Sequence, residues 1–158
     1  MTTRIATCRC SDLTANCAGE PVRVSVCHCL DCQRRSGSAF AFQARWPEAQ
    51  VAISGAWSEW SHTGETGNRA IFRFCPRCGV TIAYTSEGLP GLIAIPVGTL
   101  ADPSFPSPEY SVWEGRKHRW VAVIGDGIDH FDSPGSCAPA RQSFVALWLA
   151  RPQALRPR

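Results

Sequence analysis

Nine cysteines occur in this sequence of 158 residues, and seven of them fall into three short groups. The groups are Cys-Arg-Cys at 8–10, Cys-His-Cys-Leu-Asp-Cys at 27–32 and Cys-Pro-Arg-Cys at 75–78. At about 6% of the residues, the cysteines are sparser than in a disulfide scaffold, and their number is odd. The first residues lack the uninterrupted apolar core of a secretory signal. We therefore expect a cytoplasmic protein whose clustered cysteines serve metal or redox chemistry.

The spacing within each group suits zinc. Cys8 and Cys10, if they lie in a strand, point to the same side of it, as do Cys27 and Cys29. The third group predicts a tight turn, because Pro76 fixes its own φ and Gly79 can adopt a positive φ. A lone Cys-x-x-Cys is ambiguous, but a second cysteine pair favours a four-thiolate zinc site over a redox pair.

The groups divide into a closed site and an open one. A closed structural zinc site would take its four ligands from the first and third groups: Cys8, Cys10, Cys75 and Cys78. Cys27, Cys29 and Cys32 then remain with no obvious fourth cysteine. Three protein ligands and one open position are typical of catalytic zinc, which can hold water or a substrate thiol there. We expect two zinc ions per chain.

Alternatives for the open group remain. A fourth ligand from Cys17, Cys137 or a histidine would make it a second structural site. Without metal, Cys29 and Cys32 would form a redox pair.

Five further residues need interpretation. His28 lies between two ligands, and we expect its side chain to face away from them. Cys17 and Cys137 are otherwise expected to be buried as small apolar residues. Arg34 and Arg35 are either solvated surface charges or the groups that recognise a substrate carboxylate in bidentate fashion.

The remaining pattern predicts a mainly β fold. Short alternating or β-branched segments, separated by Gly, Pro, Asn and Ser, predict strands at 22–26, 40–46, 70–74, 80–85, 92–97 and 120–124. Helices are predicted at 29–36 and 140–150. Connections too short for crossover helices favour antiparallel pairing, and the six tryptophans are expected in the core.

Length and charge limit the remaining possibilities. The chain has the size of one domain, which we place at 1–135, followed by a segment at 136–150 and a mobile tail at 151–158. The net charge of +3 comes from three arginines in the last eight residues, so the sequence gives little ground for nucleic-acid binding. No apolar run approaches the roughly 20 residues of a membrane span.

The combined motifs resemble the glutathione-dependent formaldehyde-activating enzyme family, which includes centromere protein V. The resemblance rests on the Cys-x-Cys pair, on CHCLDCQRRSG at 27–37 and on FCPRCG at 74–79. It extends over residues 4–134, where Trp120, Asp126 and Phe131 are similar to the family's closing residues.

The resemblance implies a zinc-bound β-tent fold of antiparallel sheets with few short helices, and the same division of ligands. It also implies a carbon–sulfur lyase that joins formaldehyde to glutathione as S-hydroxymethylglutathione. Our leading hypothesis is a zinc-dependent lyase that acts on a small-molecule thiol and a small aldehyde, with Arg34 or Arg35 guiding carboxylates. The alternatives are a non-catalytic zinc-stabilised binding or scaffold protein and a thiol redox sensor. The oligomeric state is left open.

Overall fold

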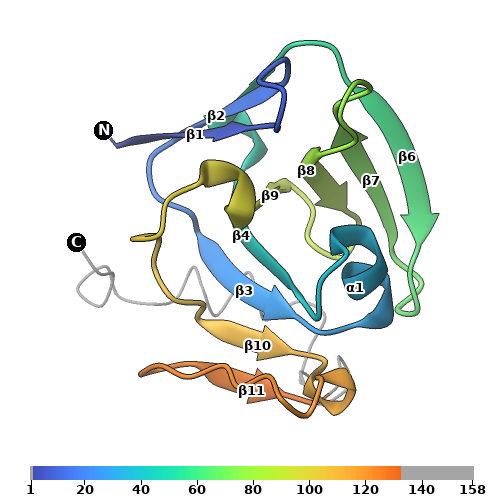
Figure 1. The fold of residues 1–158 in the computed structure, drawn as a ribbon, viewed down its shortest axis with the longest axis vertical. Coiled ribbons are helices and arrows are strands. Elements are labelled where there is room, and N and C mark those ends of the chain that lie inside the picture. The colour runs from blue at the N-terminus through green and yellow to red at the C-terminus, as the bar shows by residue number, and fades with distance from the viewer. Residues whose placement is uncertain (1, 133–158) are drawn as a thin grey trace.

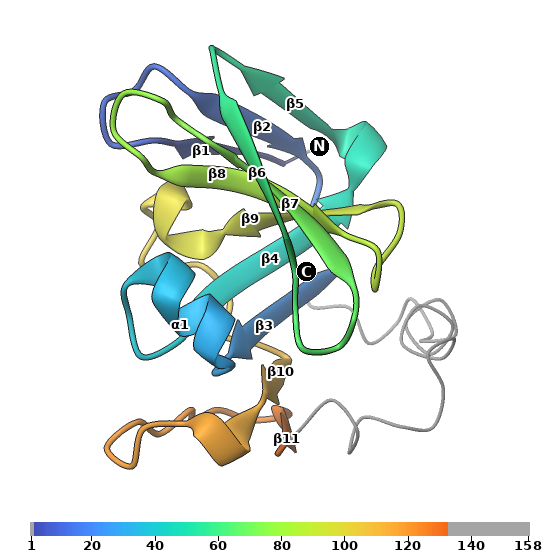
Figure 2. The same cartoon turned by 90° about the vertical axis from the view of Figure 1, so that its right-hand side faces the viewer.

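The computed structural model describes residues 2–132, which form two β-sheets and one short α-helix. The smaller sheet has three strands in the order β1-β2-β5, and the larger has eight in the order β11-β10-β3-β4-β9-β8-β7-β6. The smaller sheet lies at one end of the molecule, whereas β10 and β11 lie at the other (Figures 1 and 2). The prediction of a mainly β fold is confirmed.

Each sheet takes its strands from several parts of the chain. The smaller sheet contains β1 (Thr3–Thr7), β2 (Thr14–Ala18) and β5 (Val51–Ser54). The larger sheet contains β3 (Arg23–Cys27), β4 (Ala41–Pro47), β6 (Ser58–Thr63), β7 (Arg69–Phe74), β8 (Thr81–Ser86), β9 (Leu92–Pro96), β10 (Tyr110–Val112) and β11 (Asp129–Phe131). The helix α1 spans Leu30–Ser36, and short 3-10 turns occur at Glu48–Gln50, Val97–Leu100 and Glu114–Arg116.

Strands β3 and β4 have two different faces, as their alternating sequences predict. Val24 pairs with Ala44, and both belong to the buried apolar core together with Trp46. Ser25 pairs with Gln43 on the opposite face, where both polar side chains are also buried. Because neighbouring side chains of a strand point to opposite sides, one face of this strand pair completes the core and the other is polar.

Five of the six predicted strands are present, within about one residue of the expected bounds, as β3, β4, β7, β8 and β9. The predicted helix at 29–36 is α1. The prediction of a strand at 120–124 is wrong, because the chain turns at this point and Trp120 and Ile124 are exposed without a pairing partner. The predicted helix at 140–150, the tail at 151–158 and Cys137 lie outside the described residues. No described helix is long and apolar enough to cross a bilayer.

Pairing is antiparallel throughout the described ladders except at one edge of the larger sheet. There β10 runs parallel to both β3 and β11. We expected antiparallel pairs because adjacent segments have short connections, but β3 and β10 are joined through most of the sheet itself. This long return replaces a crossover helix.

The tryptophans depart from expectation. Trp46 is fully buried and its indole donates to the carbonyl oxygen of Gly19 at 3.0 Å. Trp57, Trp60 and Trp120 are instead 43%, 56% and 75% exposed. Trp60 lies on β6, an edge strand, which has a neighbour on one side only. Within residues 2–132 the core is therefore built mainly from small and β-branched side chains around a single buried indole.

Candidate metal centres and their pocket

The first candidate centre contains four cysteines from two distant parts of the chain. The sulfur atoms of Cys8, Cys10, Cys75 and Cys78 all lie within 4.8 Å of one another. The Sγ of Cys10 is 3.6 Å from that of Cys8 and 3.5 Å from that of Cys75. Four sulfurs held about 2.3 Å from a central zinc would be about 3.8 Å apart, so the observed spacing fits a tetrahedral thiolate site.

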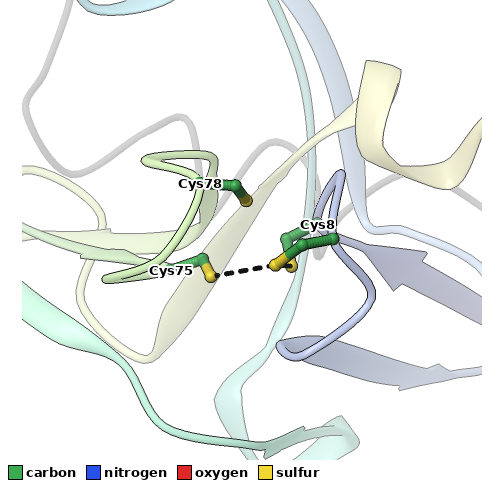
Figure 3. A group of neighbouring side chains, drawn as sticks. Cys8, Cys75 and Cys78 are labelled. Carbon is green, nitrogen blue, oxygen red and sulfur yellow. Dashed lines mark hydrogen bonds between the residues drawn. The ribbon is translucent and has the colours of Figure 1, made fainter.

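Both cysteine pairs lie on tight turns that face each other (Figure 3). Cys75 and Cys78 lie between β7 and β8, where Gly79 has a φ of +73°, as the sequence predicts. Cys8 and Cys10 lie between β1 and β2, so the expectation that they belong to a strand is wrong. Ser11 adopts a φ of 66° in this turn, which directs the chain back toward β2.

This four-cysteine centre joins the two sheets. Its ligands come from the β1–β2 turn of the smaller sheet and the β7–β8 turn of the larger one. Cys8 and Cys75 are only 2% and 1% exposed and belong to the apolar core. Outside the cluster, Arg77 forms an ion pair of 2.9 Å with Asp12 of the opposite turn. The contacts fit a closed site with a structural role.

The second candidate centre is built from one short segment. Cys27 is the last residue of β3, Cys29 caps the N-terminus of α1, and Cys32 lies in the first turn of that helix. Their three sulfurs also lie within 4.8 Å of one another. No further Cys, His, Asp or Glu of residues 2–132 joins this group. Three thiolate donors of this kind suit zinc and leave one coordination position free of protein.

The local hydrogen bonds favour an ionised sulfur at Cys29. Hydrogen bonding from the thiols of Cys27 and Cys32 lowers the pKa of Cys29, and the backbone N–H of Cys32 donates to its Sγ at 3.3 Å. The same contacts, together with burial, raise the pKa of Cys27. Because metal binding requires thiolates, the remaining protons would leave as an ion binds.

The other candidate ligands lie elsewhere. Cys17 is fully buried in the apolar core, as expected of a structural thiol. His28 is also fully buried, and its Nε2 is 3.2 Å from the Oγ of Ser111 rather than in the cysteine group. Neither residue closes the second centre.

A cavity of about 290 Å³ opens beside the three-cysteine group and is lined by all three of its members. One row of cross-strand partners spans the larger sheet beneath it. From β6 to β3 the row consists of Trp60, Phe72, Tyr84, Ala94, Arg45 and Arg23. The cavity therefore has the three cysteines at one end, an aromatic wall and a cationic floor.

The two candidate substrate residues lie on different sides of α1. Arg35 lines the cavity, and its guanidinium lies 5.0 Å from the ring centroid of Tyr84. Arg34 is not among the lining residues; its side chain is 74% exposed and pairs with Asp31 at 3.5 Å.

Sequence reasoning missed the polar residues on the strand face that leads to Cys27. Arg23 and Ser25 precede Cys27 at two-residue spacing on β3, and Gln43 and Arg45 show the same spacing on β4. All four line the cavity. Their alternation with apolar residues, in phase with Cys27, was the signal that could have identified them.

Comparison with known proteins gives a family match and a similar structure. Residues 3–116 match the model of the family described as glutathione-dependent formaldehyde-activating enzyme. No curated protein matches the chain. A crystal structure of a Rhodobacter sphaeroides protein is similar with a TM-score of 0.50 and 21% sequence identity, over 63% of this chain and 91% of that one. At this identity the structural likeness supports the fold alone.

Proposed function

The chain belongs to the glutathione-dependent formaldehyde-activating enzyme family, and from this premise we propose that it is a zinc-dependent carbon–sulfur lyase. Its substrates would be a thiol, glutathione in the first instance, and a small aldehyde such as formaldehyde. The observation that carries the proposal is the group of Cys27, Cys29 and Cys32, which lines a cavity and has no fourth ligand among the described residues.

The chemistry needs a thiolate held beside a carbonyl carbon. Zinc would supply the free position at which the substrate sulfur is held in its thiolate form. Cys27, Cys29 and Cys32 would hold the ion, and three thiolates give the centre a formal charge of −1. This charge limits Lewis acidity, so positioning of the thiol contributes more than polarisation of the carbonyl.

The net reaction is balanced without an oxidant or reductant. The substrate thiol loses its proton, its sulfur forms a bond to the aldehyde carbon, and the carbon–oxygen π bond breaks. The oxygen then takes up a proton to give the S-hydroxymethyl product. The reverse sequence releases the aldehyde, so one site serves both directions.

The direct test is NMR exchange spectroscopy of formaldehyde and glutathione with the zinc-loaded protein. We expect faster exchange with the unchanged protein and with Cys17→Ala, a control in the core, but not with Cys29→Ser. If the unchanged protein leaves the exchange rate at its background value, the lyase proposal is wrong. Two tightly retained zinc ions would then favour a non-catalytic scaffold, and a reversible disulfide between Cys29 and Cys32 would favour redox sensing.

A further inference from the structure

A histidine and an aspartate meet at the edge of the cavity. His62 of β6 is the one histidine among the cavity-lining residues that the structure describes, and its Nε2 lies 3.3 Å from the Oδ2 of Asp31. Asp31 also lines the cavity, and it lies between Cys29 and Cys32 in the first turn of α1. Its other carboxylate oxygen, Oδ1, pairs with Arg34 at 3.5 Å. The imidazole is therefore tied to the turn that holds two of the three cysteines.

Trp60 fixes the plane of the His62 ring. The two residues are two positions apart on β6, so they share one face of the strand. Their rings stack with centroids 5.4 Å apart and an angle of 9° between the planes. Trp60 is 56% exposed, so this contact, rather than burial in the core, gives the indole a defined partner. With a carboxylate at one edge and an indole across its face, the imidazole has a set orientation, and the indole face also favours its protonated form.

The carboxylate also decides which ring nitrogen carries the proton of the neutral imidazole. A carboxylate only accepts, so Nε2 of His62 donates to Asp31 and the lone pair lies on Nδ1. Within residues 2–132, Nδ1 has no hydrogen-bond partner. An imidazole held in one tautomer by a carboxylate, with its second nitrogen open, is the arrangement of an oriented general base.

The other titratable side chains of the cavity, outside this pair and the cysteine group, are poorly suited to exchange a proton. Arg116 bonds to Glu65 at 2.6 Å and lowers the pKa of that carboxyl, which keeps it ionised. Burial raises the pKa of Tyr84 to about 12, so the phenol keeps its proton at neutral pH. The arginines keep theirs as well. His62 is left as the side chain that can both take up and release a proton.

We propose that His62 is the general base and general acid of the lyase reaction and that Asp31 is its positioning residue. The inference rests on the proposed function and supplies the proton path that the reaction needs. Nδ1 takes the proton of the thiol as the sulfur forms its bond to the aldehyde carbon. The same nitrogen gives this proton to the oxygen once the carbon–oxygen π bond has broken. One proton leaves sulfur and one reaches oxygen, and the reverse reaction uses the same path.

The competing explanation is that His62 only fastens the edge strand β6 to α1. The side chains of His62 and Asp31 are 41% and 38% exposed, and contacts this exposed contribute little to stability. Replacing the imidazole should therefore leave the fold intact. Glutamine keeps an N–H donor for Asp31 but cannot carry a proton between two reactants. His62→Gln thus retains a fastening contact and removes a proton carrier.

The experiment measures formaldehyde–glutathione exchange by NMR with zinc-loaded protein and saturating thiol, after subtraction of the protein-free rate. We expect His62→Gln to lower the catalysed rate at least about tenfold, as loss of a general acid–base group does. Its zinc content and its calorimetric affinity for glutathione should stay unchanged. His118→Gln is the matched control, because that histidine bonds to Gln33 at 3.0 Å and does not line the cavity. It should keep the full rate.

Two further variants test the proton path itself. His62→Ala should be slow, and free imidazole should restore its rate at least about fivefold above the imidazole background, because a base in solution then replaces the missing ring. Asp31→Asn should slow the unchanged protein but cause no additional loss in His62→Gln, as expected of a residue that acts through the imidazole.

Exchange that is fast in the unchanged protein and equally fast in His62→Gln would overturn the proposal and leave the lyase standing. A slow His62→Gln protein that has lost zinc or glutathione affinity, or a His62→Ala protein that imidazole does not restore, would overturn it in favour of a structural contact. If circular dichroism shows that one of these variants is unfolded, the other decides. An unchanged protein without catalysed exchange would remove the lyase and the role of His62 together.

Discussion

Ser111 of β10 donates a hydrogen bond of 2.6 Å to Glu114, and its Oγ also lies 3.2 Å from the Nε2 of His28 in the segment that contains the three-cysteine group. Because the Ser111 proton points to Glu114, the buried His28 must donate from Nε2 to the Ser111 oxygen. Glu114 also accepts from Lys117 at 2.9 Å and from His130 at 2.7 Å. His28, the residue between Cys27 and Cys29, is therefore anchored through Ser111 to a half-buried carboxylate.

We expect Glu114→Gln to lower the free energy of unfolding by roughly 1–3 kcal/mol at pH 7, because several donors then face a weaker acceptor. Burial alone would raise the pKa of Glu114, but hydrogen bonds from Ser111, His130 and Lys117 outweigh it and lower that pKa to about 2. The stabilisation is thus present above pH 4.5 and lost as the pH falls toward 2. Urea unfolding at pH 7 measures the effect, with the exposed Glu48→Gln as control; equal midpoints for both variants would contradict the prediction.

Tyr84 should resist ionisation. Its pKa of about 12 means that about a tenth of it is ionised at pH 11, against about nine tenths for an ordinary tyrosine. Since the folded state holds this proton more tightly than the unfolded state, folding stability falls as the pH rises from 10 to 12. The chain has two tyrosines, so ultraviolet titration of Tyr110→Phe reports Tyr84 alone. A midpoint near 10 in the folded protein would refute the burial argument.

Loss of a ligand from the four-cysteine centre should destabilise the whole fold. For Cys75→Ser we expect one zinc fewer and a decrease of at least about 4 kcal/mol in the free energy of unfolding, because the two sheets lose their common ion. Cys17→Ala, which removes a buried thiol outside both centres, should cost about 1 kcal/mol and no zinc. Elemental analysis and urea unfolding give both quantities. A Cys75→Ser protein with unchanged stability would show that this centre has no structural role.

Loss of a ligand from the three-cysteine centre should affect metal content more than folding. Cys29→Ser is expected to bind one zinc, to keep its circular dichroism spectrum and to change the free energy of unfolding by less than about 2 kcal/mol. A chelator added to the unchanged protein should remove this zinc first and leave the chain folded. Simultaneous loss of both ions with unfolding would instead indicate two structural sites.

The strands that were predictable are those with strong alternation or β-branched runs, such as β3 and β9. The sequence around Trp120 to Ile124 has the same local character, but no partner strand is available to it, and pairing is decided by the whole fold. The parallel alignment of β10 with β3 could likewise not be predicted from the sequence, because the chain reaches β10 only after passing through most of the sheet.

The two cysteine groups were more predictable than the pocket. Cysteine spacing restricts the geometry so strongly that both groups were correctly assembled, even though Cys8 and Cys10 lie on a turn rather than a strand. Arg45 gave no comparable signal, since a single arginine in a strand is ordinary. Alternation along β4 only hints at its side, and the register, which sets it opposite Arg23, places it on the cavity face.

The two centres differ in how much of the chain must exist before they can form. Cys10 and Cys75 are 65 positions apart, so the four-cysteine centre has to wait until the β7–β8 turn has been synthesised. The three-cysteine centre is complete within six consecutive residues, and closing so short a loop has little entropic cost. On a growing polypeptide it is the first set of thiolates able to capture an ion, long before the sheets that will surround it have paired.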